Sequence, residues 1–347
     1  MKLPLKLKQD GIHYSPNKCY SYNKFFNIIL GARGVGKTTG YLIKALQNYN
    51  KDGSQFIYLR RYKPELSEFI SVGLLDTIAD GIAYIGGGKT SLKMIYQDPS
   101  TGEKDTIGYG MPLSAAVREK SVQLPRVSTI IFDEAFLIRG ANYRYLKDEV
   151  PALLNFVSTV FRTRDNGKVI LLGNNDDLFN PYFEYFNLPL IDDIYVDNDR
   201  GIYVEYTKPS PKLLEMEKKT GLYALTQNTN FGRYHYQNEL FSTKSGTIID
   251  KPANATLYIK AVLDKRTLMI YKFYIKNELH FWCNSVEKMS DDNITYNLIE
   301  DGNINYYYME LFKDKFKNLL YINYYNNCVF YGNARARDEF CWLMDVM

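Results

Sequence analysis

Cysteine and histidine are scarce in this chain, which has four of the former and three of the latter among 347 residues. The cysteines lie far apart and form no C-x-x-C pair, so we expect neither a zinc site nor a disulfide framework. A reducing compartment is what this cysteine usage predicts. A strong excess of one charge is also lacking, and the net charge of +4 permits a nucleic-acid partner without indicating one.

Long apolar runs are missing as well. No stretch reaches the ~18 apolar residues of a membrane span, and residues 1–10 alternate lysine and leucine without the apolar centre of a secretion signal. We therefore expect no membrane partner. The hydrophobic content of 46% is enough for sizeable cores, and the length predicts two domains, or one large domain with an appendage.

The first feature that carries chemistry is a glycine loop between a predicted strand, Phe25–Leu30, and a predicted helix, Thr39–Gln47. The loop reads GARGVGKT and fits G-x-x-x-x-G-K-[ST] at every fixed position. Its glycines let backbone N–H groups approach a phosphate, while the lysine reaches the β/γ-phosphates and the threonine hydroxyl binds Mg²⁺. The sequence therefore predicts an ATP site formed by Gly31, Ala32, Arg33, Gly34, Val35, Gly36, Lys37, Thr38 and Thr39.

A later predicted strand ends in two adjacent carboxylates. Val127–Glu134 reads VSTIIFDE, in which an apolar run leads directly into Asp133 and Glu134. Carboxylates that end a buried strand are costly unless a cation or a chemical task compensates them. Because the phosphate loop lies upstream, we interpret Asp133, with Thr38, as the Mg²⁺ partner and Glu134 as the residue that activates water. The plain alternative is the cap of a following helix.

Two further predicted strands end in polar side chains. Gln55–Arg60 is followed by Arg61 and Lys63, and this basic cluster is either a solvated strand end or a contact for phosphate on the nucleotide or a nucleic acid. Lys168–Gly173 leads into Asn174, which either orients the attacking water or forms an ordinary Asx turn.

An amphipathic helix is predicted over Glu149–Phe161, and Arg162 and Arg164 follow it. Such an arginine usually remains solvated or faces the negative end of the helix dipole. In a ring-shaped ATPase it could instead reach the γ-phosphate of the neighbouring subunit. The residues alone leave both interpretations open.

A proline-rich stretch at 208–211 ends the first predicted domain, residues 1–207. Residues 208–246 are predicted as a linker region, and residues 247–347 as a small mixed α/β domain. Other expected elements are a helix over 65–80, a small β insertion around 82–96, a helix over 212–225, a β meander over 256–284, a helix over 308–320, an aromatic strand over 321–331 and a terminal helix over 337–347.

Five stretches together resemble the DNA-packaging motor ATPases of small tailed bacteriophages, the phi29-like group. The resemblance covers most of the chain up to residue 210 and then fades to architecture only. The stretches are GARGVGKT, FIYLRRYKPEL (Phe56–Leu66), VSTIIFDE (Val127–Glu134), EVPALLNF…VFRTR (Glu149–Arg164) and NPYFEYFNL (Asn180–Leu188).

The resemblance implies a P-loop NTPase of the additional-strand, catalytic-glutamate type, which uses ATP and Mg²⁺ and forms a ring, in the family a pentamer. It implies that the ring sits on a viral procapsid portal in the host cytoplasm and pumps double-stranded DNA. By resemblance, Arg162 acts on the nucleotide of the adjacent subunit, with Arg164 as the fallback and Lys120 as a second trans-acting cation. Lys63 corresponds to a candidate DNA contact in the pore.

The C-terminal domain of the family looks like an RNase H-type nuclease fold that has lost its active site. A two-metal nuclease needs clustered carboxylates on its first strand, and the matching run Thr267–Ile275 holds none. We therefore expect no cleavage and a docking or DNA-binding role. The use of the family's helper RNA by this chain is left open, because the chain matches the family poorly in that region.

Two other classes of function remain. A P-loop kinase would phosphorylate a small acceptor and would need neither Glu134 nor an arginine from a neighbour. A scaffold would use ATP only to lock an assembly, without DNA movement.

Overall fold

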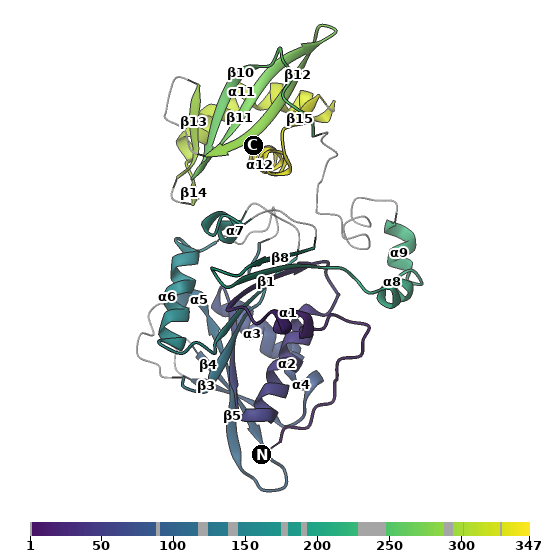
Figure 1. Ribbon diagram of the computed structural model, residues 1–347, viewed down its shortest axis with the longest axis vertical. Helices are drawn as coiled ribbons and strands as arrows, with labels where there is room; N and C mark the ends of the chain where they lie inside the picture. The colour runs from purple at the N-terminus through teal and green to yellow at the C-terminus, as the bar shows by residue number, and fades with distance from the viewer. Residues whose placement is uncertain are drawn as a thin grey trace. The chain divides into compact units, whose positions relative to one another are not determined.

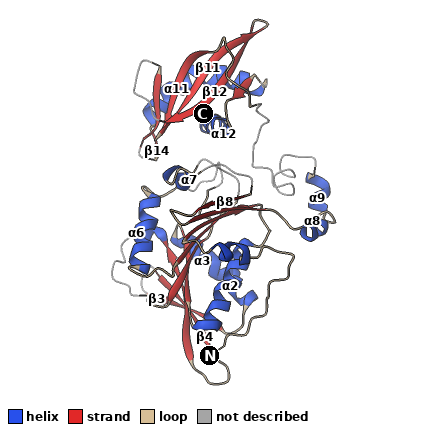
Figure 2. Cartoon of the chain, in the orientation of Figure 1, coloured by secondary structure: helices blue, strands red, loops and turns tan. Residues whose placement is uncertain are grey.

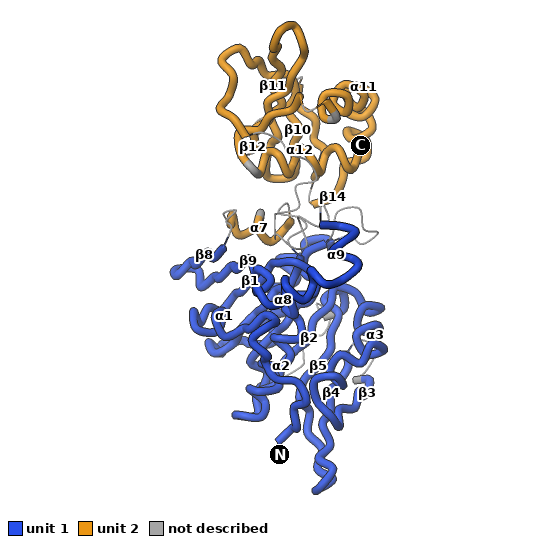
Figure 3. Tube along the Cα trace, turned by 90° about the vertical axis from the view of Figure 1, so that its right-hand side faces the viewer, with its two compact units in different colours: residues 1–137, 144–176, 191–241 blue, residues 138–143, 177–190, 242–347 orange. Residues whose placement is uncertain are grey.

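The computed structural model describes residues 2–87, 91–116, 124–137, 145–174, 180–188, 193–227, 248–287, 294–300, 302–326 and 328–347. The chain divides into two compact units (Figure 3). Unit 1 consists of residues 1–137, 144–176 and 191–241, and unit 2 of residues 138–143, 177–190 and 242–347. The division does not follow a single cut, because two short segments, 138–143 and 177–190, lie between parts of unit 1 in sequence but belong to unit 2.

Unit 1 is built from a sheet with helices on its two faces, as Figures 1 and 2 show. Its strands are β1 (Phe26–Gly31), β2 (Gln55–Arg60), β3 (Ile82–Gly87), β4 (Ser91–Gln97), β5 (Lys104–Pro112), β6 (Val127–Phe132), β7 (Lys168–Leu172), β8 (Ile194–Asp197) and β9 (Ile202–Thr207). Its helices are α1 (Asn17–Tyr22), α2 (Lys37–Asp52), α3 (Lys63–Val72), α4 (Leu74–Ile78), α5 (Leu113–Ala116), α6 (Glu149–Phe161), α8 (Pro211–Glu217) and α9 (Gly221–Thr226).

The strand order in this sheet is β3-β4-β5-β2-β6-β7-β1-β9-β8. The strands from β5 to β9 in this order run parallel, and β3, β4 and β8 add antiparallel pairs at the two sides. Because parallel strands end at the same edge, the residues that follow β1, β2, β6 and β7 meet there. Strand β7 pairs with both β1 and β6, so it separates the strand before the glycine loop from the strand before the two carboxylates.

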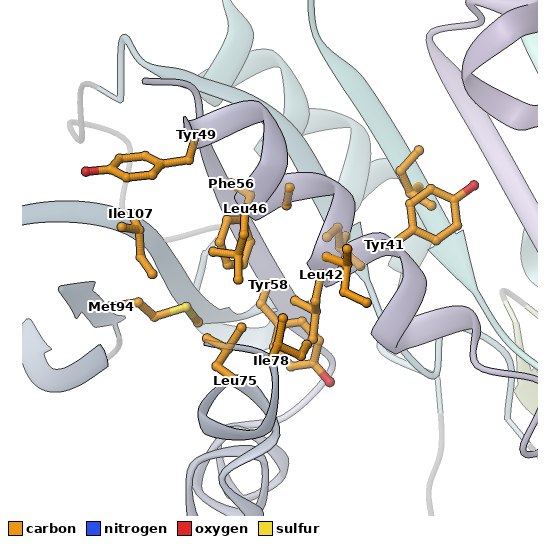
Figure 4. Packing of buried hydrophobic residues seen from close by; sticks show 14 of the residues in the cluster. Tyr41, Leu42, Leu46, Tyr49, Phe56, Tyr58, Leu75, Ile78, Met94 and Ile107 are labelled. Atoms are coloured by element: carbon orange, nitrogen blue, oxygen red, sulfur yellow. The ribbon is translucent and has the colours of Figure 1, made fainter. Parts of the chain in front are cut away.

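Burial on both faces explains why the central strands are continuous apolar runs. Every residue of β1, β2 and β9 is buried, and α2 and α6 cover opposite faces of the sheet in Figure 1. Figure 4 shows the core beneath α2, where Leu42 and Leu46 pack toward Tyr58 and Phe56 of β2. A fully buried leucine of this kind contributes about 1.5–3 kcal/mol, so α2 is anchored firmly behind the glycine loop.

Several expectations for unit 1 need correction. The single helix predicted over 65–80 is two helices, because Gly73 has a φ of 63° and ends α3 before α4 begins. The predicted β strands around 82–96 are present as the antiparallel pair β3 and β4, but they extend the main sheet, since β4 pairs with β5. Strand β5 was not predicted because it is polar and rich in glycine. The helix predicted over 212–225 is divided, and Thr220 caps the start of α9.

Unit 2 has a second sheet, of order β14-β13-β10-β11-β12-β15. The predicted meander is confirmed, and β13 and β15 pair in parallel with β10 and β12 at its two sides. Helices α11 and α12 bury their apolar faces against this sheet. The elements are α7 (Pro181–Tyr185), β10 (Thr256–Leu263), β11 (Arg266–Ile275), β12 (Glu278–Glu287), β13 (Thr295–Glu300), β14 (Asn303–Ile304), α11 (Tyr306–Tyr325), β15 (Val329–Tyr331) and α12 (Ala334–Val346).

The aromatic strand predicted over 321–331 is wrong. Helix α11 continues to Tyr325, and only Val329–Tyr331 is a strand. Phe316, Leu320 and Tyr324 recur at helical spacing and are all buried in the core, so this periodicity outweighs the strand preference of the tyrosines. Among the described residues, no helix combines the length and apolar character needed to cross a bilayer.

Candidate functional site

The glycine loop runs from the end of β1 into α2, whose first residue is Lys37. At two positions of the loop, Gly31 and Gly36, a larger residue would clash with neighbouring atoms. Gly36 has a φ of 90°, and a Cβ there would lie 2.9 Å from the His13 Cβ. A Cβ on Gly31 would lie 1.9 Å from the Thr207 Oγ1 of β9. The loop therefore passes close to its neighbours and leads directly into the N-terminus of α2, and a helix N-terminus favours a phosphate.

The loop lysine is held by oxygen atoms at this edge of the sheet. Lys37 Nζ donates hydrogen bonds of 2.8 Å to the carbonyl oxygens of Gly31 and Ala32. A longer contact of 3.5 Å joins it to Asn174 Oδ1. Asn174 follows β7, so the strand between β1 and β6 brings its polar end to the loop.

Thr38 and Asp133 meet directly. The Thr38 hydroxyl lies 3.0 and 3.1 Å from the two Asp133 carboxylate oxygens. The buried Tyr58 hydroxyl of β2 donates to Asp133 Oδ2 at 2.7 Å. Burial raises the pKa of Tyr58, and the charge of Asp133 raises it further, so the phenol stays protonated as a donor. A hydroxyl and a carboxylate held together are hard oxygen ligands, and this donor set fits Mg²⁺.

Glu134 is the next residue along the chain and differs from Asp133 in its setting. Its φ is 52°, a left-handed conformation that is uncommon for a residue with a side chain. Its side chain is 67% exposed, and Arg60 Nη2 binds its carboxylate at 2.6 Å. Arg60 also contacts Asp133 Oδ2 at 3.7 Å and Glu65 Oε2 at 3.4 Å. One arginine therefore compensates the carboxylates at the end of β6.

The interpretation of the basic cluster as a solvated strand end is wrong for Arg60 and Arg61, because both side chains are buried. Arg61 is 1% exposed, and its guanidinium forms a bidentate pair with Glu149 at 2.7 and 2.9 Å. It also donates to the carbonyl oxygens of Glu134, at 3.2 Å, and Ala135, at 2.8 Å. Protein carboxylates and backbone oxygens are therefore the partners of these arginines.

The two arginines after α6 have different surroundings. Arg162 is exposed. The Arg164 guanidinium donates to the carbonyl oxygens of Leu124, Pro125 and Val127 at 2.6–3.0 Å and to that of Val160 at 2.7 Å. These bonds put the end of α6 beside the start of β6, away from the edge that holds the glycine loop.

The remaining predicted site residues are spread over the loop and its surroundings. Arg33 is exposed, and Thr39 is half-buried in the first turn of α2. Lys63 is exposed at the first position of α3. Lys120 lies outside the described residues.

Tyr58 contacts the site but belongs to none of the motifs that predicted it. The available signal was a phenol hydroxyl within a buried central strand, because such a group needs a hydrogen-bond partner. Its partner, Asp133, lies 75 residues away in sequence, so no local pattern links the two.

Replacing Tyr58 with phenylalanine is expected to raise the Mg²⁺ concentration needed for half-maximal ATP turnover, because Asp133 loses a hydrogen bond that orients it. The loss of a bond to a charged group should also lower the free energy of unfolding by about 1.5–3 kcal/mol. Tyr49→Phe is a matched control, since the Tyr49 hydroxyl donates to Asp105 at 2.8 Å. It should affect stability but not the Mg²⁺ titration, and equal titrations for both variants would contradict the assignment.

A family model described as "Podovirus DNA encapsidation protein (Gp16)" matches residues 8–329. The chain belongs to this family. Members with similar sequences include the DNA packaging protein of Bacillus phage phi29, 32% identical over 259 residues that make up 73% of each chain. The DNA packaging protein of Bacillus phage B103 is 35% identical over 246 residues, which are 71% of this chain and 73% of that protein. The resemblance indicated by the motifs is thus confirmed.

The fold is similar to solved packaging proteins over nearly the whole chain. A chain of "The bacteriophage Phi-29 viral genome packaging motor assembly" matches with a TM-score of 0.58 and 26% identity, covering 96% of this chain and 99% of that one. A chain of "The Phi-28 gp11 DNA packaging Motor" matches with a TM-score of 0.55 and 20% identity, covering 97% and 98%. Together with the glycine loop and the strand order, this likeness establishes the α/β P-loop ATPase fold.

Proposed function

We propose that this chain is the ATPase subunit of a ring-shaped motor that drives double-stranded DNA into a viral procapsid. Its family is that of the podovirus DNA encapsidation proteins, and its relatives from phages phi29 and B103 are DNA packaging proteins. The motor would work in the host cytoplasm while attached to the procapsid portal. A pentameric ring is part of the proposal, and a helper RNA is left open.

The observation that carries the proposal is the hydrogen bond of Thr38 to Asp133 at the edge that holds the glycine loop, with Glu134 as the next residue along the chain. Thr38 and Asp133 would hold Mg²⁺, which when bound to ATP neutralises charge on the β- and γ-phosphates. Lys37 would exchange its loop carbonyl partners for phosphate oxygens. The position of β7 between β1 and β6 supports the additional-strand, catalytic-glutamate class.

Glu134 would orient the attacking water and accept its proton. In the structure its carboxylate is bound to Arg60 at 2.6 Å, so this role requires the carboxylate to leave the arginine. The large exposure of the side chain leaves room for that rotation. Asn174, within 3.5 Å of Lys37, would contact the γ-phosphate or the water from the other side.

Arg162 would complete the site of the adjacent subunit. Its exposure, and the bonds of Arg164 that fix this end of α6 beside the start of β6, support a role outside its own site. Arg164 is a poorer choice for the trans-acting group, because backbone carbonyl oxygens already engage its guanidinium. Lys120 remains a proposed second cation and Lys63 a proposed DNA contact.

We further propose that residues 247–347 form a vestigial RNase H-like nuclease domain without cleavage activity. In support, β10 to β12 form an antiparallel meander and β13 lies parallel beside β10. The run Thr267–Ile275, which lies in β11, has no carboxylate that could hold a catalytic metal ion, and neither does the preceding strand β10. Docking or DNA binding is the role left for this domain.

DNA should stimulate ATP hydrolysis by the purified protein if the motor proposal is right. Contacts with DNA phosphates would make this stimulation independent of sequence, and it should decline steeply as the salt concentration rises. Phosphate release with and without double-stranded DNA measures it, and Lys37→Ala, which removes the phosphate-binding cation, should be inactive under both conditions. Transfer of the γ-phosphate to a small acceptor, with no effect of DNA, would instead establish a kinase.

A further inference from the structure

Helix α6 is fixed at its start to the end of β6. Arg61 Nε and Nη2 bind the two oxygens of Glu149, the first residue of α6, while Nη1 and Nη2 donate to the carbonyl oxygens of Glu134 and Ala135. The guanidinium carbon also lies over the ring of Phe132, 5.5 Å from its centre, and over that of Tyr145, 4.9 Å from its centre. One planar, buried group thus joins three segments of the chain.

The same helix is fixed at its other end to the start of β6. Arg164 donates to the carbonyl oxygen of Val160 in the last turn of α6, and also to those of Leu124, Pro125 and Val127. Val127 is the first residue of β6. An arginine fork can satisfy several carbonyl oxygens at once, whereas a lysine would supply a single point charge.

The two groups proposed to act on nucleotide lie just beyond these two attachments. Glu134 follows the end of β6, and Arg162 directly follows α6. Both have a φ of 52°, so each backbone has an uncommon conformation that its surroundings must maintain. A helix of 13 residues spans about 20 Å, which separates the two groups by the length of one element.

We propose that Arg61 and Arg164 are positioning residues that join β6 and α6 into one rigid strut, with Glu134 at one end and Arg162 at the other. The proposal rests on the trans role of Arg162 in the function proposed above. Arg61 positions Glu134 for the subunit's own site and the start of α6 for the neighbour's site. Arg164 positions Arg162 for the neighbour's site alone. A displacement of the backbone at Glu134 is then transmitted along α6 to the adjacent nucleotide.

Rings mixed from two kinds of variant subunit test the two ends of the strut independently. Arg162→Ala subunits keep Glu134 but supply no arginine, and Glu134→Gln subunits supply the arginine but do not hydrolyse ATP. Each is inactive alone, and the mixture should recover ATP turnover at interfaces where an Arg162→Ala site faces a Glu134→Gln donor. A further substitution can then be placed in the donor only or in the hydrolysing subunit only.

Arg164→Ala in the donor should lower the recovered turnover about 10- to 100-fold, because a small misplacement of a catalytic group has effects of this size. In the hydrolysing subunit the same substitution should leave the recovery at the level of the parent mixture. Arg61→Lys should lower the recovered turnover whether it is placed in the donor or in the hydrolysing subunit. Arg126→Ala is the matched control, since this exposed arginine next to β6 pairs with Asp105. It should leave the recovered turnover unchanged in either subunit.

ATP binding and ring assembly of every variant are measured in parallel, and Arg164→Lys replaces Arg164→Ala if the alanine variant does not fold. The strut would be overturned, with the motor function intact, by either of two results for an Arg164 variant. One is an equal loss of recovered turnover in the donor and in the hydrolysing subunit, and the other is no loss when the variant is in the donor. If the parent mixture recovers no activity although the wild-type protein hydrolyses ATP, the trans role of Arg162 itself is wrong, and the strut is wrong with it.

Discussion

Replacing Glu134 with glutamine is expected to lower ATP turnover by about 10²–10⁴-fold, the contribution of a general base. The amide is nearly the same size as the carboxylate but cannot accept the proton of the attacking water. ATP binding should be unaffected, because Lys37, Thr38 and Asp133 are unchanged. Single-turnover hydrolysis, with nucleotide affinity measured separately, distinguishes the chemical step from binding.

Glu68→Gln provides a matched control for this substitution, since Glu68 is an exposed glutamate on α3. It should keep wild-type turnover. A Glu134→Gln protein that hydrolyses ATP at the wild-type rate would remove Glu134 from the mechanism. A protein that binds ATP and assembles, but loses DNA movement together with hydrolysis, would exclude the scaffold function.

Removing the Arg162 side chain is expected to lower turnover by about 10³–10⁵-fold, the range for an arginine that stabilises charge on the transferred phosphoryl group. The loss should appear mainly in kcat, because the side chain contributes at the transition state more than in the ground state. Steady-state kinetics at saturating DNA measure both constants.

Arg200→Ala is the control for Arg162→Ala, since Arg200 is an exposed arginine that pairs with Asp197 at 2.7 Å. It should retain wild-type kinetics. Recovery of Arg162→Ala by Glu134→Gln subunits would show that the arginine acts across an interface. Full activity of the Arg162→Ala protein would contradict the ring mechanism.

The parts of the site that could be predicted are those specified by local sequence. The glycine loop has strand, loop and helix in immediate succession, and the carboxylates of Asp133 and Glu134 directly follow an apolar run. The helix Glu149–Phe161 has the predicted bounds because its apolar positions follow one helical face. The rule that parallel strands end at one edge then brings these separate motifs together.

The parts that could not be predicted depend on partners distant in sequence. Arg61 reads as a basic surface residue, yet it is buried because Glu149, 88 positions away, balances its charge. Strand β5 has little strand character, and its Gly108 is needed where a Cβ would lie 2.8 Å from the Phe56 ring. In α11 the tyrosines favour a strand locally, but the core contacts of Leu320 and Tyr324 extend the helix.

The most direct test of the motor function is the packaging of double-stranded DNA into purified procapsids, measured as DNA that becomes protected from added nuclease. With the wild-type protein and ATP, protected DNA should accumulate with time. With Glu134→Gln at the same protein concentration it should stay at the level seen without ATP. Equal protection by the two proteins would contradict ATP-driven movement of DNA by this chain.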